Sequence, residues 1–218
     1  MPAWDTGTVS DETQHYFSAT PTGDFRPREV RVELAGAERT VVTAGGVFSP
    51  DGVDRGTEVL LRWLDELPAP DPGSGAGSAI LDIGCGWGPI ALSAALTHPD
   101  REIWAVDVNE RSRELCAQNA ARLGLTNVRV CAPESVPDDL DFSDIRSNPP
   151  IRVGKAALHD ILRQWLPRLT SVGTASLVVA KHLGAESLAT WIAREFSALT
   201  VQRAHRDRGF HVIRVERS

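Results

Sequence analysis

Three glycines at alternate positions, Gly84, Gly86 and Gly88, form the segment of this sequence best suited to hold a ligand. They follow a short apolar segment of strand type and precede Pro89, a residue favoured at the first position of a helix. Glycine lets the chain turn tightly and approach a ligand, and the N–H groups that open a helix attract anionic groups. The G-x-G-x-x-G fingerprint of dinucleotide binders would need glycine where Pro89 stands, and the lysine of a P-loop is absent. The spacing therefore favours another class of cofactor-binding loop.

Two polar side chains at the ends of later strands complete the candidate chemistry. Asp107 lies at the end of the second predicted strand, where a carboxylate can accept hydrogen bonds from both hydroxyls of a ribose. Asn148 follows the fourth strand and precedes Pro149 and Pro150, which lack backbone N–H donors and stiffen the turn. The remaining groups are acceptors, the Asn148 side-chain oxygen and a backbone carbonyl, and they suit an exocyclic N–H₂ group. Methyl transfer to such a nitrogen is an in-line displacement, so orienting the nucleophile is most of the task.

Each of these features also has a structural interpretation. The glycines can serve packing, Asp107 can be a charge at the start of a helix, and Asn-Pro is common at turns. Their joint occurrence at consecutive strand ends favours a cofactor and substrate site.

Strands and helices alternate from residue 79 onward. We expect strands over residues 79–83, 103–108, 128–131, 142–147 and 175–180, and a final antiparallel pair over 199–204 and 210–215. Helices are expected over residues 89–97, 110–123, 158–169 and 186–196. This alternation predicts a largely parallel sheet covered on both faces, with the ligand at the carboxyl ends of the strands.

The chain divides at a Pro/Gly/Ser-rich linker, residues 68–78. Residues 1–67 are expected to form an N-terminal extension with an irregular first segment, a hairpin, a loop and an amphipathic helix. Residues 79–218 are expected to form the main domain.

The formal net charge of −6 at pH 7 is unevenly distributed. Residues 1–143 carry 11 basic and 23 acidic side chains, a net of −12, whereas residues 144–218 carry 12 and 6, a net of +6. Such asymmetry often accompanies an anionic partner. Composition therefore excludes avid nonspecific nucleic-acid binding but permits a local RNA site. The candidates for phosphate contact, which can equally be solvated surface charges, are Arg152, Lys155, Arg203, Arg206, Arg208 and Arg214.

The sequence gives no sign of a metal, a disulfide framework or a membrane segment. The cysteines Cys85, Cys116 and Cys131 lie far apart, with no CxxC pair and no histidine at ligand spacing. No apolar run approaches the roughly 18 residues that a membrane span needs, and the acidic N-terminus lacks the apolar region of a secretory signal. We therefore expect a cytoplasmic protein without metal.

The chain resembles the small-methyltransferase family of class I S-adenosylmethionine-dependent methyltransferases over about residues 16–215. The matching segments are residues 46–49, 53–57, 82–88 (with the spacing D-x-G-x-G-x-G) and 148–155, of which the last is the most specific. Segments 184–188 and 209–212 add weaker support. The best-known members of this family are guanine-N2 methyltransferases of small-subunit ribosomal RNA.

The resemblance implies an α/β fold, a Rossmann-like seven-stranded class I methyltransferase sheet with helices on both faces and a small N-terminal appendage. It implies S-adenosylmethionine as cofactor, held by Asp82, Gly84, Cys85, Gly86, Gly88, Asp107, Val108 and Asn148. The catalytic residues, which would hold the acceptor amine, are Asn148, Pro149, Pro150 and Ile151. The expected substrate contacts are Phe48, Arg152 and Lys155, and loop 47–54 is expected to close over the site.

Three departures from the family pattern bear on the substrate. Ile151 stands where amino-directed methyltransferases usually carry an aromatic residue that stacks on the base, which weakens an adenine-N6 reading. Ala132, Pro133 and Glu134 replace the expected Gly-Asp after the third strand, so the adenine pocket stays unassigned. We expect no second, degenerate half like that of larger ribosomal RNA members, so substrate recognition is expected to fall on this domain, a partner or dimerisation.

The leading hypothesis is methyl transfer to an exocyclic amine, guanine N2 of small-subunit ribosomal RNA, with that RNA or the subunit as partner. One alternative is the same chemistry on a protein glutamine amide. Another is a catalytically idle methyltransferase fold that serves as a binding module. The nucleotide and the oligomeric state, monomer or homodimer, stay open.

Overall fold

The computed structural model of the chain describes residues 25–67 and 79–217; residues 1–24 and the predicted linker 68–78 lie outside the described residues. The strands are β1 (Arg28–Leu34), β2 (Ala37–Thr43), β3 (Ala79–Ile83), β4 (Ile103–Val106), β5 (Val128–Cys131), β6 (Phe142–Ser147), β7 (Leu169–Ala180), β8 (Leu199–Asp207) and β9 (Phe210–Arg217). The α-helices are α2 (Arg55–Asp65), α3 (Pro89–Thr97), α4 (Glu110–Arg122), α5 (Lys155–Trp165) and α6 (Ala185–Glu195).

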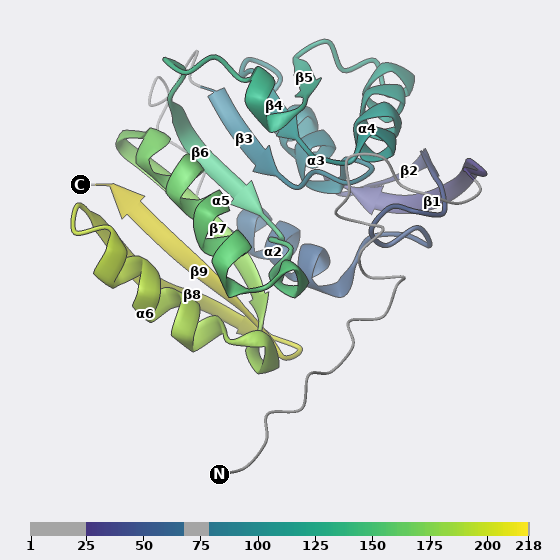
Figure 1. The fold of residues 1–218 in the computed structure, drawn as a ribbon. Coiled ribbons are helices and arrows are strands. Elements are labelled where there is room, and N and C mark those ends of the chain that lie inside the picture. Colours follow the sequence, from purple (N-terminus) through teal and green to yellow (C-terminus); the bar gives the residue numbers. More distant parts are fainter. Residues whose placement is uncertain (1–24, 68–78, 218) are drawn as a thin grey trace.

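Seven strands form one sheet in the order β5-β4-β3-β6-β7-β9-β8 (Figure 1). Neighbouring strands are parallel from β5 to β7, whereas β9 runs antiparallel to both β7 and β8. From β3 the chain proceeds to β4 on one side and later returns to β6 on the other. In open α/β sheets the ligand site lies beyond the carboxyl ends of the strands at such a switch point. The predicted Rossmann-like seven-stranded fold is confirmed, and its site is expected beyond β3 and β6.

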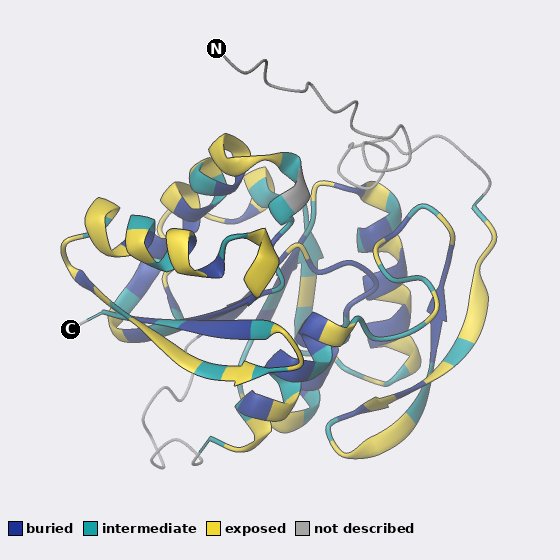
Figure 2. Ribbon diagram, turned by 90° about the horizontal axis from the view of Figure 1, so that it is seen from below, coloured by how far each residue is buried: buried dark blue, intermediate teal, exposed yellow. Residues whose placement is uncertain are grey.

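Helices cover both faces of the sheet, as the alternation of strands and helices predicts (Figure 1). Leu162 of α5 and Ile192 of α6 belong to the core on one face, and Ala91 and Ala94 of α3 pack against strands on the other. The central strand β3 is buried along its whole length. Figure 2 shows the buried residues on the sheet and on the helix sides that face it. The sheet edge that carries the strand ends is therefore held rigidly.

The N-terminal hairpin β1–β2 packs on α4 rather than joining the large sheet. Its apolar residues alternate with charged ones, and Ala35 and Gly36 make the tight turn with positive φ angles of 50° and 70°. Asn119 of α4 ties the hairpin down, since its side chain bonds both the N–H (2.6 Å) and the carbonyl (2.9 Å) of Val42. The same side chain donates to the carbonyl of Trp87 in the glycine loop. The hairpin and the glycine loop are thus fixed to one helix.

Several element boundaries differ from the sequence prediction. Strands β8 and β9 end at Asp207 and Arg217, three and two residues beyond their predicted ends, and the helix predicted over residues 158–169 is α5, Lys155–Trp165. The second strand of the main domain, β4, ends at Val106 and not at residue 108, because Asp107 already accepts the N–H of Asn109 and turns the chain into α4. Strand β7 begins at Leu169, six residues before the predicted start, and the pairing with β6 is irregular there. The first part of β7 contains polar residues such as Thr170, so it lacks the apolar pattern by which a strand is predicted. Within residues 25–67 and 79–217, no helix combines the length and apolarity of a membrane span.

Candidate active site

The glycine loop is held open at the end of β3 by bonds to the neighbouring strand β4. The N–H groups of Gly84 and Cys85 both donate to the carbonyl of Val106, at 2.8 and 3.0 Å. Gly84 and Gly86 have positive φ angles of 73° and 56°, which only glycine adopts without strain. A Cβ built on either residue meets no atom within 4 Å, so both face open space. This geometry fits a loop against which a ligand lies.

Asp107 lies beside the loop at the end of β4, as predicted. Its Oδ2 accepts the N–H of Gly86 and its Oδ1 accepts the N–H of Asn109, both at 2.9 Å. Burial raises the pKa of Asp107, although these backbone donors and Arg113 act in the opposite direction. Each carboxylate oxygen keeps a further lone pair, so the pair can still accept two hydroxyl groups.

Asp82 and Gly88 support the loop from behind and line neither of the two cavities at this site. The Oδ2 of buried Asp82 accepts the N–H of Ala91 in the first turn of α3, at 3.0 Å. At Gly88 an added Cβ would lie 2.9 Å from the Sγ of Cys116. Both residues thus shape the start of α3.

Cys85 is no nucleophile in this setting. Its side chain is buried, and a hydrogen bond with Cys116 together with burial raises the pKa of its thiol well above the usual value. A thiol that resists ionisation is inert. The residue lines a small recess as a compact side chain.

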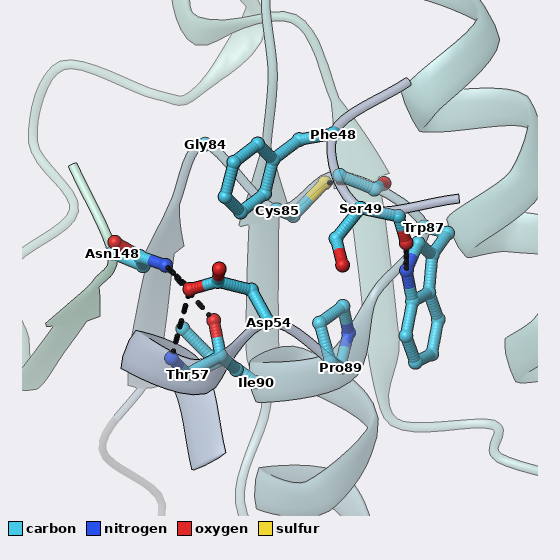
Figure 3. A pocket seen from close by; sticks show the side chains of 11 residues that line it. Phe48, Ser49, Asp54, Thr57, Gly84, Cys85, Trp87, Pro89, Ile90 and Asn148 are labelled. Atoms are coloured by element: carbon cyan, nitrogen blue, oxygen red, sulfur yellow. Dashed lines mark hydrogen bonds between the residues drawn. The ribbon is translucent and has the colours of Figure 1, made fainter. Parts of the chain in front are cut away.

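Asn148 enters the site from the end of β6 and contacts the N-terminus of α2 (Figure 3). Its Nδ2 donates to Oδ2 of Asp54 at 2.9 Å and to Oγ1 of Thr57 at 3.1 Å. Asp54 is also the N-cap of α2, and its Oδ2 accepts the N–H groups of Gly56 and Thr57. The predicted catalytic turn is therefore joined to the N-terminal extension through side chains.

A cavity of about 860 Å³ opens between these elements, a size suited to a cofactor together with part of a substrate. The predicted site residues that line it are Phe48, Gly84, Gly86, Asp107, Val108, Asn148, Pro149, Pro150 and Ile151. A small recess beside it shares Phe48, Asp54 and Asn148 with this cavity and adds Cys85. In Figure 3 the Phe48 ring stands over the Asp54 carboxylate. Phe48 is 49% exposed and lies at the mouth.

The predicted closing loop, residues 47–54, forms one wall of this cavity. The indole N–H of Trp87 in the glycine loop donates to the carbonyl of Ser49 at 3.2 Å, and the hydroxyl of Thr43 bonds the carbonyl of Pro50. Loop 47–54 is thus tied to the glycine loop and to β2 at the same time.

Several lining residues were not among the predicted site residues. Asp54 had a local signal, because Asp is favoured at the N-cap of a helix. Pro133 and Glu134 line the cavity at the point where the family pattern fails. His182, Leu183 and Phe210 also line it, but they come from β7–α6 and β9, and no local motif marks them.

Three of the six basic residues expected at an RNA-contacting rim are paired with carboxylates. Arg203 bonds Glu186 at 2.8 Å, Arg208 lies 3.6 Å from Glu58, and Arg214 bonds Glu216. Lys155 is exposed at the start of α5 and is not part of the cavity lining; the side chain of Arg152 lies outside the described part of the structure. A rim contact by these residues stays a prediction.

Among the described residues, no three His, Cys, Asp or Glu side chains lie together in a way that could hold a metal ion.

The family comparison decides the class to which this geometry belongs. The family model described as the methyltransferase small domain matches residues 38–214, well over half of the chain. The chain belongs to this family.

Relatives of this small-domain methyltransferase include proteins of its own size and longer ones. YbxB of Bacillus subtilis, described as uncharacterized, is 33% identical over 208 residues, which cover 94% of this chain and 99% of that protein. The ribosomal RNA small subunit methyltransferase C of Shewanella sp. MR-4 is 29% identical over 197 residues, 88% of this chain and 50% of that protein. The chain thus spans about half the length of this second relative.

Among solved structures, the 16S rRNA N2 G1207 methyltransferase of Thermus thermophilus, in complex with AdoMet and guanosine, has the same fold with a TM-score of 0.73. It is 24% identical, and the match covers 91% of this chain and 52% of that one. The expected family, fold and S-adenosylmethionine-dependent methyltransferase class are confirmed. The roles of individual residues and the division at residues 68–78 stay predictions.

The glycines of the loop share one sequence motif, but we expect substitutions at Gly84 and Gly88 to affect different properties, cofactor affinity and stability. An alanine at a positive φ costs about 1–2 kcal/mol. At Gly84 the new Cβ meets no protein atom but occupies ligand space, so Gly84→Ala should weaken S-adenosylmethionine binding about tenfold or more, a loss of roughly 1.4 kcal/mol. At Gly88 it meets Cys116 and Leu92, so Gly88→Ala should lower the free energy of unfolding by about 3 kcal/mol, through strain and overpacking.

Urea unfolding and calorimetric titration with S-adenosylmethionine, applied to both variants, separate the two effects. A Gly84→Ala protein with unchanged cofactor affinity would contradict a ligand at this loop, and a fully stable Gly88→Ala protein would contradict the packing argument.

Proposed function

We propose that this small-domain methyltransferase transfers a methyl group from S-adenosylmethionine to an exocyclic amine, guanine N2 of small-subunit ribosomal RNA. The observation that carries the proposal is the orientation of Asn148. Both N–H bonds of its carboxamide are used by Asp54 and Thr57, which leaves its oxygen as an acceptor beside the donor-free turn of Pro149 and Pro150. An amine that donates to this oxygen is held with its nitrogen in a fixed direction.

The cofactor-side residues fit the proposed ligand. Gly84 and Gly86 leave a backbone surface without Cβ atoms, and Asp107 has free lone pairs for two ribose hydroxyls. Val108 is 46% exposed and lies where a flat adenine ring can pack. When bound, S-adenosylmethionine supplies a sulfonium methyl group to the acceptor nitrogen. The chain's own part is to orient the amine and to keep water from it, with Phe48 at the mouth.

Ribosomal RNA as the substrate is supported by two comparisons of differing strength. The Shewanella relative is named a ribosomal RNA small subunit methyltransferase, and the Thermus structure was solved with guanosine. Both proteins are about twice as long as this match, so their whole activity does not pass directly to this chain. Ile151 packs beside the proposed base site without an aromatic ring to stack. We place the enzyme in the cytoplasm, where its substrate is made.

Transfer of tritium from labelled S-adenosylmethionine tests the proposal. The acceptors are naked small-subunit RNA, assembled small subunits and total protein, all from a strain that lacks this gene. We expect label in RNA or subunits, recovered as N2-methylguanosine after digestion to nucleosides. Label found only in protein would overturn the RNA substrate and favour a glutamine amide. Absence of S-adenosylmethionine binding by calorimetry would instead favour an idle binding module.

A further inference from the structure

Asp54 lies between the start of helix α2 and the predicted catalytic turn. It is separated from Asn148 by 94 residues in the sequence. Its Oδ2 accepts three N–H groups, from Gly56 at 2.8 Å, Thr57 at 3.3 Å and the Asn148 side chain at 2.9 Å. A carboxylate oxygen can only accept. Asn148 must therefore turn its N–H₂ group toward Asp54, and its flip state is fixed.

The second oxygens of both side chains remain available. Among the described residues, neither Oδ1 of Asn148 nor Oδ1 of Asp54 has a hydrogen-bond partner, and both residues line the large cavity and its recess. Figure 3 shows the free Asp54 oxygen pointing away from α2, toward the Phe48 ring. One wall of the cavity thus offers two acceptors from two different elements.

We propose that Asp54 is a specificity residue of this site, which orients Asn148 and with its own Oδ1 reads a second N–H donor next to the acceptor amine. The inference rests on the proposed function and deepens it. The guanine edge carries two adjacent donors, N1–H and N2–H₂, and matches two acceptors. Adenine presents its N1 acceptor beside its amine, and a glutamine amide presents its carbonyl oxygen, so a carboxylate oxygen repels both.

The variant Asp54→Asn tests this role with little change to the fold. Asparagine caps helices as well as aspartate does, and its oxygen can still accept from Gly56, Thr57 and Asn148. Its N–H₂ group then replaces the free Oδ1, which changes an acceptor into a donor. Guanosine binding should weaken roughly 10- to 100-fold, the effect of losing a bond to a charged group. Binding of 2-aminopurine riboside, which has the same amine but an acceptor at N1, should be retained or improved.

The affinities for guanosine and 2-aminopurine riboside are measured by NMR titration in the presence of S-adenosylhomocysteine. Two further variants serve as controls in these titrations. Asp138→Asn removes the same charge from an exposed loop residue that lines neither the cavity nor its recess, and should leave both affinities unchanged. Thr57→Val removes one contact to Asn148 but keeps Asp54. It should slow methyl transfer without altering the ratio of the two nucleoside affinities.

The outcomes separate this inference from the proposed function. Equal weakening of both nucleosides by Asp54→Asn, or an unchanged ratio, would overturn the reading role of Asp54. Equal or undetectable binding of the two nucleosides by the wild type would overturn it as well. The proposed function fails separately, if wild-type protein transfers no label to RNA.

Discussion

Replacing Asn148 with alanine is expected to lower the rate of methyl transfer by about 100-fold or more, the scale on which misplaced reacting groups reduce rates. The free energy of unfolding should change little by comparison. Asn148 is only partly buried, and its side-chain bonds are to Asp54 and Thr57, whose own capping bonds to the α2 backbone remain. S-adenosylmethionine affinity should fall far less than the rate, since the glycine loop and Asp107 are untouched.

The loss follows from what the alanine leaves behind. Without the carboxamide the amine has no acceptor at the Asn148 position, and the prolines beside it have no side-chain acceptor to replace it. Single-turnover transfer of tritium to RNA measures the chemical step. Gln202→Ala, which removes an exposed carboxamide on β8, is the matched control and should retain full activity. Undiminished transfer by the Asn148→Ala protein would show that Asn148 does not orient the substrate.

The parts of the fold that could be predicted from the sequence are those set by local patterns. Strand β3 and helix α3 begin and end where the apolar run, the glycines and Pro89 indicate. Strand β4 was predicted two residues too long, because Asp107 and Val108 follow apolar residues and only the tertiary bond to Gly86 shows that the chain has turned. Local pattern thus gives element type more reliably than element ends.

In the candidate site too, some residues could be predicted from local sequence and others could not. The glycine loop, Asp107 and Asn148 could be found because each follows a strand directly, and parallel strands bring their ends together. The partnership of Asp54 with Asn148 could not, because it spans 94 residues and depends on how α2 packs on the sheet. Asp82 and Gly88 belong to the motif of the glycine loop, yet the Asp82 side chain bonds the start of α3 and a Cβ at Gly88 would meet Cys116.

Asp82 gives the second large effect, on stability and its pH dependence. Burial raises the pKa of Asp82 to about 7 from its ordinary value of 3.8, and nearby Asp107 adds to the rise, whereas the Ala91 N–H and Arg146 act against it. One carboxylate oxygen, Oδ1, is buried without a hydrogen-bond partner among the described residues. The fold therefore favours the protonated form of Asp82. In the unfolded chain the same carboxyl group loses its proton at a lower pH.

The sign follows from proton binding. Between about pH 4 and 7 the folded protein holds a proton on Asp82 that the unfolded chain has released, so the free energy of unfolding falls as pH rises. Above pH 7 both states are ionised and the loss is complete. Three pKa units correspond to roughly 4 kcal/mol. A carboxamide at this position has no such proton to lose, so the Asp82→Asn protein should match the wild type near pH 4 and exceed its stability by up to that amount at pH 8.

Urea unfolding of both proteins at pH 5, 6, 7 and 8 measures this difference, with Asp138→Asn, at an exposed loop position, as the control that should show no growing gain. A difference that stays constant with pH, or a variant less stable at pH 8, would contradict the buried-proton argument. Calorimetric titration of the Asp82→Asn protein with S-adenosylmethionine also tests whether Asp82 contacts the cofactor. If Asp82 acts only by holding the start of α3, the neutral side chain keeps the Ala91 bond and S-adenosylmethionine affinity stays close to wild type. If affinity collapses while stability rises, the carboxylate itself contacts the ligand.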